Sequence, residues 1–416
     1  LPIAPGGIGD GAGAVVPRAR GIAPLRCRRA PQVRGVEFTI QEAPLRGSRW
    51  SKPLAVALGL TLVAAGCGDD DDEEDTTDTT EQGSSDTTAG GTATDFKGCE
   101  VTDTGGVDDR SFNQTAYEGL VSAADELGFE ESVLESQSAA DFEPNIQAHI
   151  DAGCDLIITV GFLLGDATAA AAEANPDQNF AIVDFDFFDV DAGEDITFDN
   201  VRELTFATDE AAFLAGYVAA AVSETGVIGT YGGINIPTVT IFMNGLAAGI
   251  EQYNTDTGES VTLAGWDPAT QEGLFTGDFE NVDNGRNTTE QLLDQNADII
   301  LPVAGPVGQG TIEAIRAGGG TQKVIWVDTD GCESVPDACD LLLTSIMKNM
   351  DVAVHDVTVA AAEGSFEGGI YTGTLENDGV GIAPFHEYED AVPQDIKDRL
   401  EELREQIISG EITVGG

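Results

Sequence analysis

The feature that most constrains this chain is a repeated alternation of two patterns after Asp95. Short apolar runs rich in β-branched residues are typical of buried strands, and the longer stretches between them carry apolar residues at helical spacing. The runs with strand character are 98–102, 156–160, 180–183, 227–231, 261–264, 299–303 and 324–327. The stretches with helical character are 112–127, 143–152, 210–222, 239–252, 287–295 and 310–317. This order predicts an α/β fold of βαβ units, in which helices cover both faces of parallel sheets.

A second series of strands begins near Val227, which indicates a second lobe. After this series, residues 341–363 have the pattern of a further strand and helix. Residues 370–385 have the pattern of a further segment that returns to the sheets. We expect an N-terminal lobe formed by residues 96–207 plus about 341–368. The C-terminal lobe is expected from 208–340 plus about 369–416. A chain that visits each lobe twice has several hinge strands, which permit the lobes to close on a ligand.

Nearly every predicted strand ends in glycine or in an acidic residue. The segments concerned read TDTGG, TVGF, VDFDF, GTYGG, LPVAG and VDTDG. Open α/β sheets bind their ligands at the carboxyl ends of the strands, where turns are tight and helices begin. The sequence therefore places the candidate site along a row of strand tips.

The first part of the chain has the organisation of an export signal. Residues 1–66 comprise an upstream segment without apolar periodicity and then a signal peptide. Basic residues from Arg46 to Lys52 precede the uncharged run 53–66, which is too short for a permanent membrane span. The string VAAGC at 63–67 resembles a bacterial lipobox, in which Cys67 would be lipidated. We therefore expect the mature chain at the cell membrane, lipid-anchored on the extracytoplasmic face.

An acidic tether follows at residues 67–95, which combine like charges with Gly, Ser and Thr. Because like charges repel and these small residues are flexible, we expect the segment to be disordered. Its acidic run lacks the spaced ligands of an EF-hand calcium loop. The whole chain carries a formal charge of −55. Nine of its 19 basic residues and three of its 74 acidic residues precede Cys67, which leaves ten basic against 71 acidic. Such a surface repels phosphate backbones, so nucleic acid is excluded as a partner.

The first predicted strand and helix carry a recognisable motif. The stretch 101–119 reads VTDTGGVDDRSFNQTAYEG. It resembles the opening motif of the basic membrane protein (BMP) family of ABC-transporter substrate-binding lipoproteins, the purine-nucleoside receptor group. Later blocks keep the family's order over residues 97 to about 390, among them FLAG at 213–216, NADIILPVAG at 296–305 and TSIMKN at 344–349. The resemblance implies a type I periplasmic-binding-protein fold, with two doubly wound parallel-sheet lobes, and capture of nucleosides for import.

The resemblance also implies a set of ligand-binding residues. Phe112 and Phe279 occupy the positions of stacking rings, which suit the flat faces of a base. Asp328 and Lys348 occupy the positions that contact ribose, where a carboxylate accepts from hydroxyls and an ammonium donates. Asp330 is a rival for the position of Asp328. The alternatives are core packing for the rings and a surface position for the lysine.

Three more residues complete the expected site. Asp103 and Asn113 stand where they can bond base or ribose edges, although both residue types also serve as turn and N-cap residues. Gly305 opens the turn GPVGQG, which either presents backbone N–H groups to the ligand or is only a tight strand-to-helix turn. No Lys-Ser/Thr follows this turn, so it is not a phosphate loop.

Four cysteines remain in the exported part of the chain if Cys67 is lipidated, and three pairings of them exist. Locality favours Cys99–Cys154, which precede two strands expected to be neighbours, and Cys332–Cys339, which flank a short loop. We expect no metal, because Cys and His residues are not closely spaced. The three histidines are scattered and catalytic elbow or metalloprotease motifs are missing, so we expect no enzyme activity and no cofactor.

Together these features predict an extracytoplasmic solute-binding lipoprotein of an ABC importer. It captures a nucleoside in the cleft between its lobes, delivers it to the permease and acts as a monomer. The alternative is a binding or sensory receptor for another small polar ligand, such as a sugar. Phe112 and Phe279 on opposite sides of one cleft would favour the nucleoside, whereas burial in separate cores would contradict it.

Overall fold

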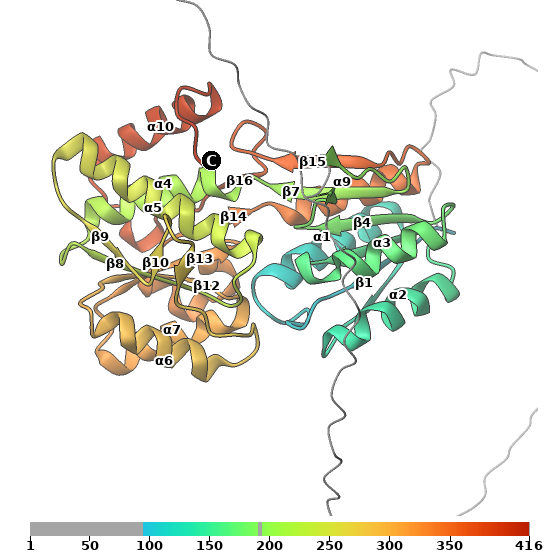
Figure 1. Cartoon of the computed structure of the whole chain (residues 1–416), viewed down its shortest axis with the longest axis horizontal. Helices are drawn as coiled ribbons and strands as arrows, with labels where there is room; N and C mark the ends of the chain where they lie inside the picture. The colour runs from blue at the N-terminus through green and yellow to red at the C-terminus, as the bar shows by residue number, and fades with distance from the viewer. Residues whose placement is uncertain (1–94, 190–193, 416) are drawn as a thin grey trace, which may run out of the picture. The chain divides into compact units, whose positions relative to one another are not determined.

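The computed structural model describes residues 95–189 and 194–415. The predicted signal peptide, Cys67 and most of the tether lie outside these residues. The described part forms two six-stranded sheets, each covered by helices on both faces (Figure 1). We call lobe 1 the sheet in the order β15-β7-β4-β3-β1-β2 with its helices, and lobe 2 the sheet in the order β16-β14-β13-β12-β8-β9 with its helices.

Lobe 1 is built from the first half of the described chain and one later visit. All strand pairs of its sheet are parallel. Its strands are β1 (Lys97–Val101), β2 (Glu130–Leu134), β3 (Leu156–Val160), β4 (Asn179–Val183), β7 (Val201–Phe206) and β15 (Gly369–Gly373). Its helices are α1 (Phe112–Leu127), α2 (Phe142–Asp151), α3 (Gly165–Ala174) and α9 (Met350–Ala362), and a small hairpin joins β5 (Phe188–Asp189) to β6 (Glu194–Asp195).

Lobe 2 repeats this plan, with one antiparallel edge strand, β16. Its strands are β8 (Val227–Gly232), β9 (Thr262–Ala264), β12 (Ile299–Val303), β13 (Lys323–Asp328), β14 (Leu342–Lys348) and β16 (Val380–Ile382), with a hairpin of β10 (Trp266–Asp267) and β11 (Glu272–Gly273). Its helices are α4 (Thr208–Val222), α5 (Pro237–Thr257), α6 (Val282–Leu293), α7 (Gln309–Gly318), α8 (Gly331–Ser334) and α10 (Gln394–Ile408). Among the described residues, no helix is both long and apolar enough to cross a bilayer.

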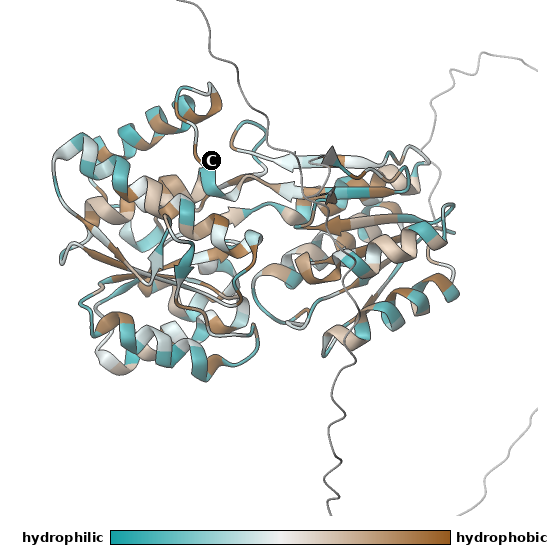
Figure 2. Ribbon diagram, in the orientation of Figure 1, coloured by the Kyte–Doolittle hydropathy of each residue, from teal (hydrophilic) through white to brown (hydrophobic). Residues whose placement is uncertain are grey.

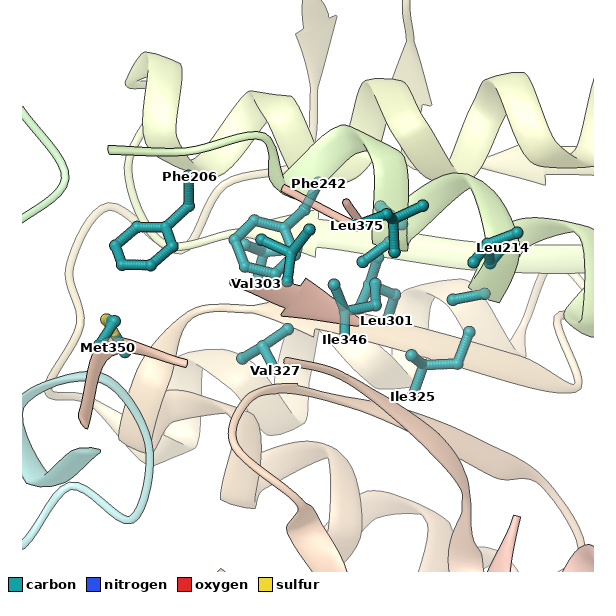
Figure 3. Close-up of a cluster of buried hydrophobic side chains, with 14 of the residues drawn as sticks. Phe206, Leu214, Phe242, Leu301, Val303, Ile325, Val327, Ile346, Met350 and Leu375 are labelled. Carbon is teal, nitrogen blue, oxygen red and sulfur yellow. The ribbon is translucent and has the colours of Figure 1, made fainter. Parts of the chain in front are cut away.

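The core follows from strands that are apolar on both faces. Every residue of β3 and of β12 is buried, as expected for central parallel strands between two helical layers. In lobe 2 the side chains of β12, β13 and β14 meet those of α4 and α5, and Figure 3 shows Leu301, Ile325 and Ile346 facing Leu214 and Phe242. Figure 2 shows hydrophobic strands inside and hydrophilic residues on the outer helix surfaces.

Three segments carry the chain between the lobes. Ala207 links β7 to α4, Asn349 links β14 to α9, and residues 374–379 link β15 to β16. The Ala207 N–H donates to the carbonyl of Gly373 over 2.8 Å, and the Asn349 N–H donates to that of Gly379 over 3.0 Å. Because the crossings are bonded to one another near a common line, they form the hinge of the two lobes.

The lobe boundaries predicted near residues 341 and 369 are each wrong by one strand. Strand β14 pairs with β13 and belongs to lobe 2, whereas β15 pairs with β7 and belongs to lobe 1. The local apolar pattern indicates a strand but not the sheet that accepts it. The sequence reading also missed β2 and β7, because the charged residues of EESVL and VRELTF interrupt their apolar runs.

Helices α4 and α5 pack so closely that glycine is required at their contact. A Cβ at Gly249 would lie 2.0 Å from the carbonyl oxygen of Phe213, and one at Gly216 would lie 2.3 Å from that of Leu246. Backbone atoms in two packed helices cannot swing aside as a flexible side chain can. These glycines therefore set the distance between the two helices.

We expect Gly249→Ala to lower the free energy of unfolding by about 1–3 kcal/mol, the usual cost of overpacking, despite the better helix propensity of alanine. The measurement is a urea unfolding curve for each variant. Gly318→Ala is the matched control, because α7 leaves open space around a Cβ there. Equal stability of Gly249→Ala and the wild type would contradict the close contact.

Candidate ligand-binding site

A pocket lies where the carboxyl ends of the two sheets meet. Lobe 1 contributes the loops after β1, β3 and β4, and lobe 2 contributes those after β12, β13 and β14. The structure brings all seven residues expected to bind ligand to this one pocket: Asp103, Phe112, Asn113, Phe279, Gly305, Asp328 and Lys348. Gly305 has a φ of 52°, which glycine adopts without strain at the end of β12. Their contacts with a ligand stay predictions.

The loop between β1 and α1 holds a network of carboxylates and backbone N–H groups. The buried Asp109 carboxylate accepts from the N–H groups of Ser111, Asn113 and Gln114. It thereby pairs with N–H groups at the start of α1 that have no acceptor within the helix. The Asn113 amide donates to Asp103 over 2.8 Å and to Asp109 over 3.2 Å. The amide oxygen of Asn113 is buried and has no hydrogen-bond partner. It is therefore an unpaired acceptor in a residue that lines the pocket.

A buried ion pair joins the lobes at the other side of the pocket. Lys348 ends β14 with 2 % of its side chain exposed, and its ammonium donates to the Asp184 carboxylate, which follows β4. The ammonium lies 4.0 Å from Asp328 Oδ1, and the Ser111 hydroxyl donates to Asp328 Oδ2 over 2.6 Å. Asp184 and Asp328 both have positive φ, 61° and 71°, which turns the chain sharply at the strand ends.

Aromatic rings from both lobes line the pocket. Phe112 begins α1 in lobe 1, and Phe279 precedes α6 in lobe 2; both are half-buried. The Phe279 ring packs on Gly233, where a Cβ would lie 2.2 Å from a ring carbon. The Lys348 ammonium lies 5.3 Å from the centre of the Phe112 ring and 4.9 Å from that of Phe242, distances typical of cation–π contact. The rings thus belong to one pocket, not to separate cores.

The pocket carries four aspartates and one lysine, so its charge is negative. Burial raises the pKa of Asp328 to about 6, although the Lys348 ammonium and the Ser111 hydroxyl favour its charged form. Burial also raises the pKa of Asp109 to about 6, although three backbone hydrogen bonds favour its charged form. The pKa values of Asp103 and Asp184 are raised by burial as well. Such a site accepts hydrogen-bond donors and disfavours anions.

Sequence reasoning missed several lining residues. Asp109 stands within the opening motif, and Asp184 follows a strand whose acidic end was noted, so a signal existed for both. Phe162 belongs to the strand tip TVGF, so it had a signal as well, whereas Phe242 lies within α5 and had none. Asp330, the rival of Asp328, does not line the pocket: it caps α8 and bonds His386 over 2.7 Å.

The four cysteines within the described residues are paired, Cys99 with Cys154 and Cys332 with Cys339. Each pair lies near a histidine, and the second also near Asp330, so that three potential metal ligands gather at each place. A cysteine in a disulfide offers no thiolate to a metal. Neither group therefore qualifies as a zinc site.

Two lobes of parallel sheet, joined by a hinge and enclosing a pocket at the strand tips, define a receptor of the solute-binding class. The family model described as "ABC transporter substrate-binding protein PnrA-like" matches residues 96–416. The chain therefore belongs to this Bmp family, as its opening motif predicted. It is the solute-binding component of an ABC transporter and not an enzyme, and the predicted type I periplasmic-binding fold is confirmed.

Individual relatives agree with this assignment. A Lactococcus lactis protein named "ABC transporter nucleoside-binding protein BmpA" is 32% identical over 377 residues, which cover 86% of this chain and 97% of that protein. A Pyrococcus abyssi lipoprotein is 30% identical over 325 residues, covering 74% and 76% of the two chains. The crystal structure of an Aeropyrum pernix solute-binding protein superposes with a TM-score of 0.68 at 27% identity, covering 76% and 92%.

The buried carboxyl groups predict how stability depends on pH. Asp109, Asp209 and Asp328 have a pKa of about 6 in the folded chain, and Glu100, wholly buried without a partner for its carboxyl oxygens, has a pKa well above its usual value. An unfolded aspartate has a pKa of about 3.9. Between about pH 4 and pH 6 the folded chain therefore holds protons that the unfolded chain has released.

The free energy of unfolding should consequently fall as pH rises through this window and stay lower above it. We expect a higher melting temperature at pH 5 than at pH 7.5, measured by calorimetry at constant ionic strength. Asp328→Asn removes one of the titrating groups and should reduce the difference between the two temperatures. A melting temperature that is lower at pH 5 would contradict the assignment.

Proposed function

We propose that this chain captures a nucleoside between lobe 1 and lobe 2 and presents it to the permease of an ABC importer. A lipid on Cys67 would hold it on the extracytoplasmic face of the cell membrane, as the lipoprotein relative supports. The observation that carries the ligand class is one pocket that combines aromatic rings from opposite lobes with a buried carboxylate and ammonium pair. The name of the Lactococcus lactis relative supports the same ligand.

The rings account for the base. Phe112 comes from lobe 1 and Phe279 from lobe 2, so closure of the lobes brings one ring toward each face of a flat molecule between them. Stacking of a base on an aromatic side chain contributes about 1–3 kcal/mol and tolerates different bases. The unpartnered Asn113 oxygen and the Asp103 carboxylate offer acceptors to the N–H groups at the base edge.

The charged pair accounts for the ribose. Adjacent hydroxyls donate well to a carboxylate, and Asp328 has lone pairs left after the bond from Ser111. An ammonium has three N–H donors, so Lys348 retains two after its bond to Asp184. Because both groups are buried, hydrogen bonds to a ligand would use donor and acceptor capacity that water cannot reach.

The negative charge of the pocket excludes phosphorylated ligands. Asp103, Asp109, Asp184 and Asp328 line the pocket with one ammonium group, and the surrounding low dielectric strengthens their repulsion of an anion. A nucleoside is neutral and rich in donors, whereas a nucleotide adds about two negative charges. The pocket therefore favours the nucleoside.

A ligand panel tests this proposal on the purified protein. We expect nucleosides to bind in calorimetry and to raise the melting temperature, because a ligand of the folded state stabilises it. The matching 5′-monophosphates should bind about 100-fold more weakly or not at all, about 2.7 kcal/mol less. Binding of free sugars without binding of any nucleoside would contradict the ligand class and favour the sugar receptor.

Substitutions test the assigned contacts. We expect Asp328→Ala and Phe112→Ala each to weaken nucleoside binding about tenfold or more, which corresponds to about 1.4 kcal/mol, by calorimetry. Asp330→Ala is the control for the first and Phe188→Ala for the second, since neither residue lines the pocket and Phe188 is 48% exposed. Wild-type affinity in both pocket variants would contradict the proposed contacts.

A further inference from the structure

Ser111 is a fully buried side chain that reaches from one lobe to the other. It lies in lobe 1, in the turn between β1 and α1, and is 0% exposed. Its hydroxyl donates over 2.6 Å to the carboxylate of Asp328, which ends β13 in lobe 2, and lies 3.4 Å from the carbonyl of Val327. The backbone of Ser111 is fixed by the Asp109 carboxylate and by Thr115. The hydroxyl is thus held in place by its own lobe.

The hydrogen bond between Ser111 and Asp328 can form only when the lobes are closed. Ser111 and Asp328 are 217 residues apart in sequence and belong to different sheets. Hinge opening at Ala207, Asn349 and residues 374–379 would separate them and return both groups to water. The hydrogen bond therefore contributes to the closed form alone.

The contact also fixes a carboxylate that lines the pocket. Oδ2 of Asp328 is engaged by Ser111, while Oδ1 points toward the Lys348 ammonium at 4.0 Å. With one oxygen held, the carboxylate cannot rotate freely, and its remaining lone pairs keep a fixed direction. A hydrogen bond to a charged group is among the stronger ones in proteins.

We propose that Ser111 is a positioning residue for ligand retention: its hydroxyl latches lobe 1 to lobe 2 and orients the Asp328 carboxylate toward the hydroxyls of the ligand. This inference rests on the proposed nucleoside function only in the identity of the ligand. Ser111 does not line the pocket, yet its hydroxyl would determine how long the receptor holds its ligand. Because the bond forms on closure, its loss speeds release more than it slows capture.

The charged groups around Asp328 give this role a distinctive pH signature. Lys348 on β14 favours its charged form, whereas Asp184 after β4 and Asp109 and Asp103 before α1 disfavour it. The Ser111 hydroxyl also favours the charged form, so its removal moves the titration of Asp328 to higher pH. The acid-side loss of ligand binding should move in the same direction.

The experiment compares the wild type, Ser111→Ala, Asp328→Asn and the double variant with a nucleoside that the wild type binds. Stopped-flow kinetics should show dissociation about tenfold faster in Ser111→Ala and association within about threefold of the wild type. The acid limb of its affinity profile should lie at higher pH. In the Asp328→Asn background, Ser111→Ala should have a much smaller effect, because the bond to the charged carboxylate is already gone.

Ser122→Ala on the exposed face of α1 is the matched control and should leave the kinetics unchanged. Dissociation and pH profile of Ser111→Ala equal to those of the wild type would overturn the latch, while nucleoside binding itself stood. The latch would also be overturned if Ser111→Ala lowered affinity in the Asp328→Asn background as much as in the wild type. The loss would then come from a change at the start of α1 and not from the bond to Asp328. Failure of every nucleoside to bind the wild type would instead contradict the proposed function.

Discussion

The ammonium group of Lys348 is buried where the two lobes meet, and the closed form of this receptor depends on it. Removing a charge from water costs several kcal/mol, and the cost is offset only where opposite charges and hydrogen bonds surround it. Here Asp184 from lobe 1, Asp328 from lobe 2 and the rings of Phe112 and Phe242 supply that environment. The same ammonium offsets part of the repulsion among the four aspartates that line the pocket. It thereby links lobe closure to the chemistry of the pocket.

The fold provides this meeting point through parallel sheets. In each lobe the carboxyl ends of the central strands lie along one edge, and the hinge brings those two edges together. Strand β14 matters most, because it carries Lys348 at its end and then becomes a hinge segment at Asn349. The residue that offsets part of the pocket's negative charge therefore lies next to the hinge, where a rotation of the lobes moves it least.

Much of this organisation could be predicted from the sequence. Apolar strands such as β3 and β12 have a signal that does not depend on distant residues. The resemblance to the BMP family implied the residues that gather in the pocket, and Phe279 and Lys348 rested on that resemblance alone. The sequence could not predict that β14 joins the sheet of lobe 2 and β15 that of lobe 1, because tertiary packing decides which strands pair. The bond of Ser111 to Asp328 was hidden for the same reason, since hinge geometry alone brings these residues together.

We propose that a neutral, donor-rich nucleoside binds the negatively charged pocket between the two lobes. The most direct measurement is a crystal structure of the protein grown with a nucleoside that it binds. We expect the base between the rings of Phe112 and Phe279, with ribose hydroxyl oxygens within about 3.2 Å of the Asp328 carboxylate and the Lys348 ammonium. A nucleoside bound outside this pocket, or with its ribose directed away from Asp328 and Lys348, would contradict it.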